Sequence, residues 1–153
     1  MILFMITYSY EHFKNDLQPL SALCKPFSPD TIIAVARGGM TLGHALAMSL
    51  DVRNLQSIRI ESYDETIQRE TVTISGSCDL QTSVNVLIVD DIIDSGATLS
   101  ALMPLLNQQY PHCQFKIATL FTKPTALIQP DFYLHEATDW IDFFWERDYL
   151  PNH

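Results

Sequence analysis

The chain has 153 residues, of which 47% are hydrophobic and 18% charged, a composition typical of a globular domain and not of a fibrous or disordered chain. Its 18 acidic residues against 9 basic ones give a net charge of -9, which would repel the phosphate backbone of a nucleic acid. The three cysteines Cys24, Cys78 and Cys113 have no CxxC or Cys/His spacing, so we expect no disulfide framework or zinc site and a reducing, cytoplasmic location.

The first part of the chain predicts a strand or tail, a helix, a buried strand and a second helix. Residues 1–6 are apolar but too short and too poor in basic residues for a signal or membrane-spanning segment, and we interpret them as an edge strand or tail. Ser9 can cap a helix that ends near Cys24, before two prolines. Residues 31–36 are apolar and rich in β-branched side chains, which predicts a fully buried strand, and a helix should cover 40–50.

The remaining elements continue the alternation of strands and helices. Strands are expected over 57–61, 70–75, 83–89 and 115–121, with a polar loop over 62–69 and a helix that opens after residues 94–98. This order predicts one α/β domain with a central, mostly parallel sheet flanked by helices. In such sheets ligands bind beyond the carboxyl ends of the strands, so the residues after Ala36, Val89 and Phe121 should meet in one crevice.

Residues 90–98, Asp-Asp-Ile-Ile-Asp-Ser-Gly-Ala-Thr, follow one of these strands. Adjacent carboxylates can accept hydrogen bonds from a sugar diol and help to hold Mg²⁺, while the N–H groups and hydroxyls after them can cradle a phosphate. The pattern therefore indicates a ribose 5-phosphate site. A plain turn in which Asp94 caps the next helix is the structural alternative, but it does not account for the whole string.

A second candidate phosphate site is Arg37-Gly38-Gly39, which follows the first buried strand. Glycine lacks a Cβ and lets the backbone approach a ligand closely, at a helix start whose N–H groups attract anions. Alone, such a pair is more often ordinary turn chemistry, and it is neither a Walker loop nor a dinucleotide fingerprint. Two anion sites on either side of a diol clamp imply a sugar with phosphates at both ends.

Residues 86–99 resemble the donor-binding signature of the type I phosphoribosyltransferases, whose donor is 5-phosphoribosyl 1-diphosphate. Residues 32–39 resemble the diphosphate-loop region of bacterial xanthine-guanine(-hypoxanthine) phosphoribosyltransferases, and 62–70 resemble their mobile loop. Lys123-Pro124 and Trp140-Ile141 fall where that family reads the purine. The resemblance implies the type I phosphoribosyltransferase fold, with a core over about 31–123 and a small C-terminal, base-binding hood over about 124–150.

The resemblance also assigns roles to individual residues. Donor binding falls to Arg37, Gly38, Gly39, Arg69, Asp90, Asp91, Ile92, Ile93, Asp94, Ser95, Gly96, Ala97 and Thr98. Base binding falls to Asp94, Lys123, Trp140 and Ile141, and Mg²⁺ binding to Asp91 and Glu146. The implied substrates are 5-phosphoribosyl 1-diphosphate and a purine base, and the implied assembly is a homodimer or homotetramer, with no nucleic-acid partner and no membrane insertion.

Asp94 is the expected catalytic residue and indicates the class of base. Relatives that act on adenine, orotate or uracil generally have a non-acidic residue there, so Asp94 implies guanine, xanthine or hypoxanthine. Its carboxylate can accept the proton that N7 or N9 of the base releases, and Lys123 can donate to O6. For Lys123 the alternative is a surface lysine at a strand end. Trp140 is expected to stack on the base and Trp145 to pack in the core.

Three departures from the family pattern, at Ala36, Ser95 and Ala97, are conservative in size and remove no carboxylate or loop glycine. A phosphoryl-accepting receiver domain is excluded by the order of its motifs, because its acid pair stands near its N-terminus. A regulator that binds nucleotides without catalysis stays open, although the acid at Asp94 favours an enzyme.

Overall fold

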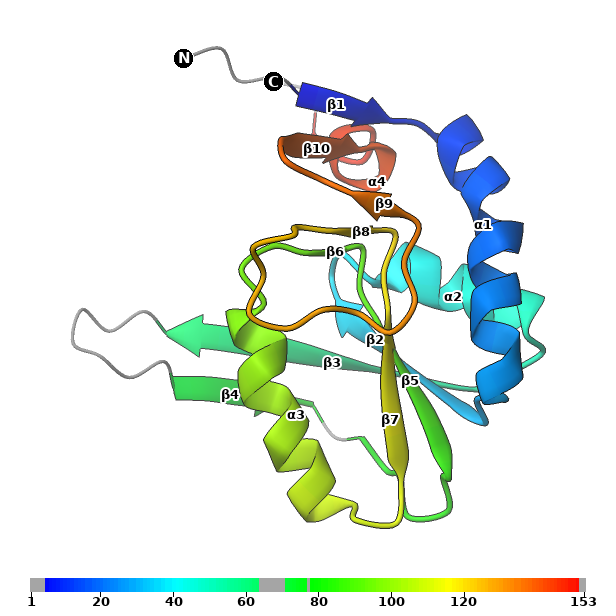
Figure 1. Ribbon diagram of the computed structural model, residues 1–153, viewed down its shortest axis with the longest axis vertical. Helices are drawn as coiled ribbons and strands as arrows, with labels where there is room; N and C mark the ends of the chain where they lie inside the picture. The colour runs from blue at the N-terminus through cyan, green and yellow to red at the C-terminus, as the bar shows by residue number, and fades with distance from the viewer. Residues whose placement is uncertain (1–4, 64–70, 77, 152–153) are drawn as a thin grey trace.

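A five-stranded sheet lies at the centre of the molecule in the computed structural model, which describes residues 5–63, 71–76 and 78–151 (Figure 1). Its strand order is β4-β3-β2-β5-β7. The strands are β2 (Thr31–Ala36), β3 (Asn54–Tyr63), β4 (Thr71–Ser75), β5 (Asn85–Val89) and β7 (Gln114–Ala118). β4 pairs antiparallel with β3, and the other three pairings are parallel. The predicted α/β class with a mostly parallel sheet is confirmed.

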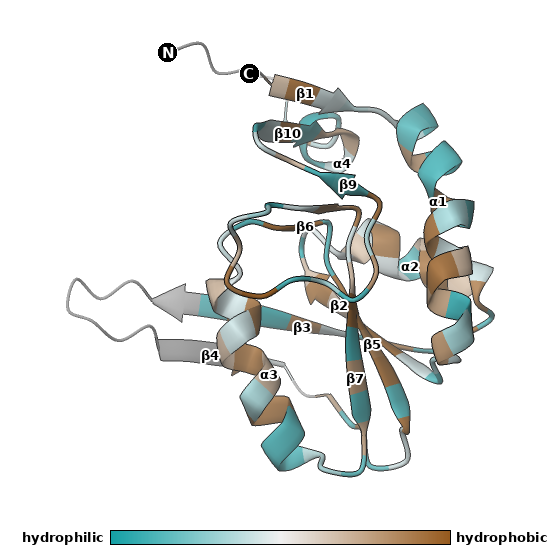
Figure 2. Ribbon diagram, in the orientation of Figure 1, coloured by the Kyte–Doolittle hydropathy of each residue, from teal (hydrophilic) through white to brown (hydrophobic). Residues whose placement is uncertain are grey.

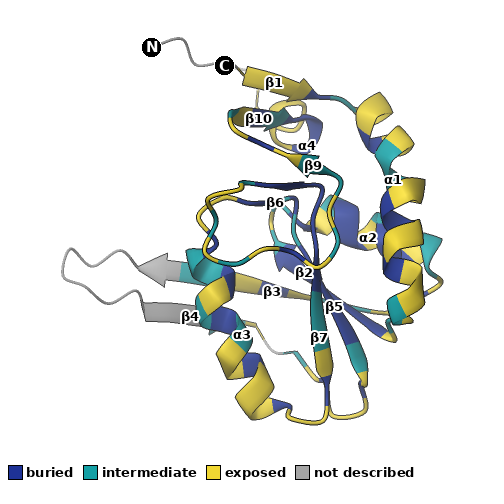
Figure 3. Ribbon diagram, in the orientation of Figure 1, coloured by how far each residue is buried: buried dark blue, intermediate teal, exposed yellow. Residues whose placement is uncertain are grey.

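Helices cover both faces of this sheet, which is why the central strands β2 and β5 are apolar apart from their first residues. α1 (Tyr10–Cys24) and α2 (Met40–Ser49) pack on one face, and α3 (Ala97–Gln109) packs on the other. Successive strand residues point to opposite faces, so Ile32 joins the α1–α2 core and Ile33 joins the α3 core. Hydrophobic residues follow the central strands in Figure 2, and Figure 3 shows exposed residues on the outer sides of α1 and α3.

The first helix begins where its sequence predicts. The Ser9 hydroxyl accepts a hydrogen bond from the His12 backbone N–H at 3.2 Å, and the Ser9 N–H donates to Nδ1 of His12 at 3.1 Å. This reciprocal pair satisfies N–H groups that a helix start leaves unpaired. A short 3-10 helix, η1 (Lys25–Phe27), then leads to Ser28, whose φ is 53°.

Two predicted strands are wrong in their extent. The strand expected over 57–61 spans Asn54–Tyr63 as β3, so the first two residues of the loop expected over 62–69 belong to it. The sequence predicts a continuous strand over 115–121, but β7 ends at Ala118, and a separate strand, β8 (Phe121–Thr122), follows it. The neighbouring strand β5 ends at Val89, opposite Ala118, so no partner remains for β7 beyond that point.

The chain instead turns into a second, smaller sheet. The backbone N–H groups of Leu120 and Phe121 both donate to the carbonyl oxygen of Asp91, at 3.1 and 3.2 Å. The order of this sheet is β6-β8-β9, formed by β6 (Ile92–Ile93), β8 and β9 (His135–Glu136). Hydrophobic periodicity cannot reveal this break, because every residue around it is buried.

The N-terminal residues form a strand that pairs with the C-terminal segment. β1 (Met5–Tyr8) lies parallel to β10 (Trp140–Phe143), and β10 leads directly into α4 (Phe144–Arg147). Of the two interpretations of residues 1–6, Met5 and Ile6 therefore belong to an edge strand. The division into a core over 31–123 and a hood over 124–150 stays a prediction. Neither of these two predicted parts includes β1. Within the described ranges, no helix is long and apolar enough to cross a membrane.

Candidate active site

Asp90 and Asp91 stand where β5 ends, at the carboxyl edge of the central sheet. Asp91 is only 6% exposed. Burial raises the pKa of both carboxyl groups, and the nearby charge of Asp91 raises the pKa of Asp90 further. Asp91 is buried and Asp90 is partly buried. Two such acids side by side oppose folding when ionised, and such arrangements concentrate at functional sites.

The acidic pair and the Arg37-Gly38-Gly39 segment lie against each other. A Cβ placed on Gly38 would lie 2.5 Å from Oδ2 of Asp91, and one on Gly39 would lie 2.4 Å from the carbonyl oxygen of Val89. A Cβ at Gly39 would require the backbone to shift, and one at Gly38 would displace the Asp91 carboxylate. The sequence led us to expect close approach to a ligand, whereas the close approach that the structure shows is to the chain's own acidic loop. The peptide bond between Ala36 and Arg37 is cis.

The loop from Asp94 to Thr98 does not use Asp94 as a helix cap. Gly96 occupies the cap position of α3 with φ of 78°, and no side chain caps that helix. The Ser95 hydroxyl accepts from the Ala97 N–H at 3.2 Å, and the Ser95 carbonyl accepts from the Leu127 N–H at 2.8 Å. The structural alternative, in which Asp94 serves as a cap, is therefore wrong.

Asp94 instead forms a salt bridge with Lys123, and both residues line a pocket. Oδ1 of Asp94 lies 2.6 Å from Nζ of Lys123, and the Asp94 side chain is 68% exposed. The pocket has a volume of about 450 Å³. Its lining consists of Asp91, Ile92, Asp94, Lys123, Asp139, Trp140, Ile141, Phe143 and Glu146. All four residues that the sequence assigns to base binding thus meet here, from three separate segments of the chain.

Sequence reasoning missed two residues of this pocket, Asp139 and Phe143. Both belong to the acidic and aromatic run over 139–146, and the alternation along β10 could have indicated that Ile141 and Phe143 share a face. Trp140 is 64% exposed, so its ring is free to take a flat ligand. Trp145 is buried in the core, as expected, but its indole also donates to Asp91.

A second hollow of about 1270 Å³ adjoins the pocket on the side of α2. It is lined by Arg37, Gly38, Met40, Thr41, Trp145, Glu146, Tyr149 and Leu150. Glu146 lines both cavities. Burial and the charges of Asp91 and Asp142 raise the pKa of Glu146, while Arg37 lowers it. No sequence signal marked Thr41 or Tyr149, which belong to no recognisable motif.

The residues assigned to Mg²⁺ are compatible with that ion when substrate oxygens complete the site. Among the described residues, no group of three or more His, Cys, Asp or Glu side chains could hold a metal ion by itself. Mg²⁺ commonly binds through one or two carboxylates together with waters and substrate phosphates. Asp91 and Glu146 line the same pocket and supply such carboxylates.

Arg69 lies outside the described residues, as do residues 64–68 of the predicted mobile loop. The phosphate contact assigned to Arg69, and the closing of that loop, stay predictions.

Three features meet at the carboxyl edge of the parallel sheet: the acidic pair, a glycine-containing turn and a loop with hydroxyl side chains. Together they define a class of protein that binds phosphorylated sugars or nucleotides. Comparison with known sequences specifies the family. Residues 17–152 match the phosphoribosyl transferase domain. The chain belongs to that family and is an enzyme that transfers phosphoribosyl groups.

Individual relatives cover nearly the whole chain. A xanthine-guanine phosphoribosyltransferase of Ruegeria sp. is 28% identical over 152 residues, 90% of this chain and 83% of the relative. The structure of the Helicobacter pylori xanthine-guanine-hypoxanthine phosphoribosyltransferase is 36% identical, with a TM-score of 0.87 over 95% of this chain and 96% of that one. A purine phosphoribosyltransferase from Pyrococcus horikoshii has a TM-score of 0.82 and 29% identity, over 97% of each chain.

Proposed function

We propose that the protein transfers the 5-phosphoribosyl group of 5-phosphoribosyl 1-diphosphate to guanine, xanthine or hypoxanthine, with release of diphosphate, in purine salvage. The observation that carries this proposal is the Asp94–Lys123 pair, which faces a pocket also lined by the exposed ring of Trp140. The names of the relatives, which specify xanthine, guanine, hypoxanthine or purine, support the same class of base.

The two charged groups suit the two edges of a 6-oxopurine. The Asp94 carboxylate accepts the proton that an imidazole nitrogen of the base loses as the bond to the ribose forms. Lys123 donates to O6 and stabilises negative charge that develops there. Adenine has an amino group in place of O6, and an ammonium group cannot accept a hydrogen bond from it. In the free protein the two residues pair with each other, so base binding exchanges one contact for two.

The donor is proposed to lie along the acidic loop. Asp90 and Asp91 accept hydrogen bonds from the ribose hydroxyls, and residues 94–98 surround the 5-phosphate with backbone N–H groups and hydroxyls. Arg37 and the start of α2 face the diphosphate. Mg²⁺, held by Asp91 and Glu146, would neutralise charge on the diphosphate leaving group. The cytoplasmic location and the homodimer or homotetramer belong to the proposal as well.

The test is to mix purified protein with Mg²⁺, the donor and one base at a time, and to follow nucleotide formation. We expect turnover with guanine, xanthine or hypoxanthine and none with adenine, orotate or uracil. Asp94→Asn should lower kcat by about 10²-fold, because the amide cannot accept the proton. Asp51→Asn makes the same chemical change at an exposed turn with φ of 54° and should retain full activity.

Two outcomes would reject parts of this proposal. Turnover with adenine equal to that with guanine would reject the proposed role of Lys123 in binding O6. Donor binding without turnover on any base would favour the nucleotide-sensing regulator instead.

A further inference from the structure

Trp145 connects the aromatic cluster at the C-terminal end of the chain to the acidic pair. Its indole Nε1 lies 3.3 Å from Oδ2 of Asp91, although the two residues are 54 positions apart in sequence. The indole N–H is the single polar group of this side chain, and Trp145 is only 8% exposed. A carboxylate is a strong acceptor for such a buried donor, so this contact is more than a consequence of packing.

Contacts on several sides fix the carboxylate of Asp91. Its Oδ1 accepts a hydrogen bond from the Ile92 backbone N–H at 2.8 Å, while Trp145 donates to Oδ2. Gly38 lies so close that an added Cβ would be 2.5 Å from Oδ2. Of these three neighbours, Ile92 and Gly38 act through the backbone. Trp145 is therefore the side chain among them that a substitution can test.

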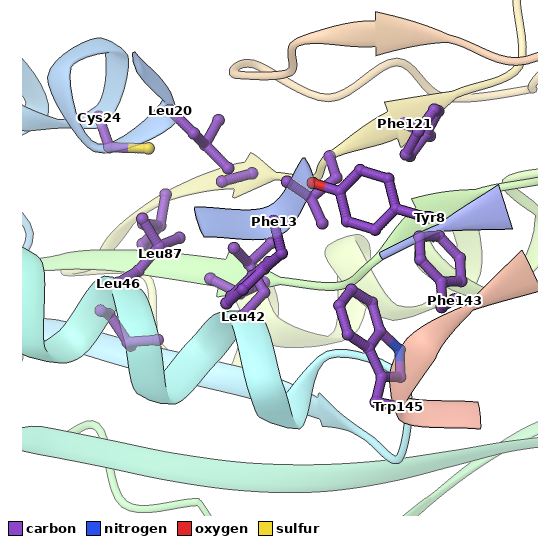
Figure 4. Close-up of a cluster of buried hydrophobic side chains, with 14 of the residues drawn as sticks. Tyr8, Phe13, Leu20, Cys24, Leu42, Leu46, Leu87, Phe121, Phe143 and Trp145 are labelled. Carbon is purple, nitrogen blue, oxygen red and sulfur yellow. The ribbon is translucent and has the colours of Figure 1, made fainter. Parts of the chain in front are cut away.

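Trp145 is itself held rigidly by rings from three elements. Phe143 stacks on it with ring centres 4.7 Å apart and an angle of 13°, and Phe13 and Tyr8 meet it edge-on at 5.6 and 6.0 Å. Figure 4 shows this group of side chains around the indole. Because aromatic contacts restrain the ring on several sides, the direction of its N–H is set before any ligand binds.

We propose that Trp145 is a positioning residue of the donor site, whose indole N–H holds the Asp91 carboxylate in the orientation that receives the ribose and magnesium ion of the donor. This inference rests on the proposed function, which supplies the ligand of Asp91. It assigns a role in the reaction to a residue that composition and spacing place only in the core. Trp145 acts through Asp91 and not on the reacting atoms.

The first test removes the N–H and keeps the ring. Trp145→Phe retains a partner for Phe143 but loses the hydrogen bond to Asp91. We expect the KM for the donor to rise about tenfold, the usual effect of losing one hydrogen bond to a charged group, with the KM for the base unchanged. Donor KM values equal to those of the wild type would overturn the inference.

Phe144→Leu is the matched control for lost packing. Phe144 is 8% exposed, as Trp145 is, and the centres of the two rings lie 5.0 Å apart. The Phe144 side chain has no polar atom. Its substitution should lower the melting temperature and leave the donor KM unchanged. A rise in donor KM as large as that of Trp145→Phe would mean that packing alone explains the effect, and would overturn the inference.

A double-mutant cycle tests whether Trp145 acts through Asp91. Donor affinity is measured by calorimetry, with Mg²⁺ and without base, for the wild type, Trp145→Phe, Asp91→Asn and the double variant. If the indole works by orienting Asp91, the loss of affinity in the double variant is smaller than the product of the single losses. Independent, multiplicative losses would overturn the inference.

A final measurement leaves Trp145 in place. The chain has 2 tryptophans, so in Trp140→Phe the single remaining indole N–H resonance belongs to Trp145. That resonance should shift on Asp91→Asn, and also when donor and Mg²⁺ bind. A resonance unmoved by both would overturn the inference. Failure of the proposed function is distinguishable, because the wild type would then consume no donor with any base, whatever the response of the Trp145 resonance to Asp91→Asn.

Discussion

The two halves of the candidate site are built in opposite ways. On the donor side, Asp91 is 6% exposed and its carboxylate is held by hydrogen bonds from Ile92 and Trp145. On the base side, the Asp94 side chain is 68% exposed and forms a salt bridge with Lys123, which the proposed binding of a base would open. The donor groups are fixed in advance at a cost in stability, whereas the base groups remain free to exchange partners. Substitutions should therefore separate stability from activity differently on the two sides.

The largest effect is expected from Asp91→Asn on the donor side. It should lower kcat/KM by about 10²-fold or more, because a charge that binds the donor and Mg²⁺ is lost. The melting temperature of the ligand-free protein should rise at neutral pH. Burial raises the pKa of Asp91 in the folded state, so the ionised carboxylate opposes folding above the ordinary aspartate range, and asparagine removes that effect. Kinetics measures kcat/KM and thermal unfolding measures the melting temperature. A fall in both would contradict the view that the donor side gives up stability for activity.

Substitutions at Gly38 and Gly39 distinguish crowding against a side chain from crowding against the backbone. In Gly39→Ala the new methyl would meet the carbonyl oxygens of Val89 and Val35 at 2.4 and 2.9 Å, so we expect a loss of about 3 kcal/mol in the free energy of unfolding. In Gly38→Ala it would meet the Asp91 carboxylate, which can shift away by weakening its hydrogen bonds, so the loss should be about 1 kcal/mol with a raised donor KM. Denaturant unfolding and kinetics on both variants test the order, and a larger stability loss for Gly38→Ala would contradict it.

Trp140→Ala tests the base side. Because Trp140 is 64% exposed, the free energy of unfolding should change by no more than about 0.5 kcal/mol. Loss of stacking should raise the KM for the base about tenfold, with the donor KM unchanged. Trp140→Phe, which keeps a ring, should have a KM for the base between those of the wild type and Trp140→Ala. An equal rise in the KM of both substrates would show that the two halves are not separable.

The prediction with the smallest effect on activity concerns a core residue outside both regions. Burial raises the pKa of Cys24 from 9.0 to about 12. The unfolded thiol ionises first, so stability falls as pH rises from about 9 towards 12, by up to about 1.4 kcal/mol per pH unit. Cys24→Ala should lack this part of the slope and keep wild-type kinetics at pH 8. Urea unfolding of both proteins between pH 8 and 10.5 measures the difference, and parallel curves would contradict it.

Much of the fold follows from local sequence patterns. The apolar run over 31–36 predicts a fully buried strand, and the prediction is correct because helices cover β2 on both faces. Ser9 marks the start of α1 because its hydroxyl satisfies a helix N–H. The break after Ala118 was missed, because it depends on where the neighbouring strand β5 ends and not on the residues of β7 themselves.

The sequence by itself determined the α/β class and the donor-side string Asp90 to Thr98, because turn chemistry, periodicity and a contiguous motif act over a few residues. The family resemblance grouped Lys123 and Trp140 with Asp94, but only the tertiary structure paired Asp94 with Lys123, gave Gly38 its close approach to Asp91, and placed the Trp145 N–H on that carboxylate. These contacts join segments far apart in the chain, and their geometry is set by how the sheet, the helices and the C-terminal segment pack together.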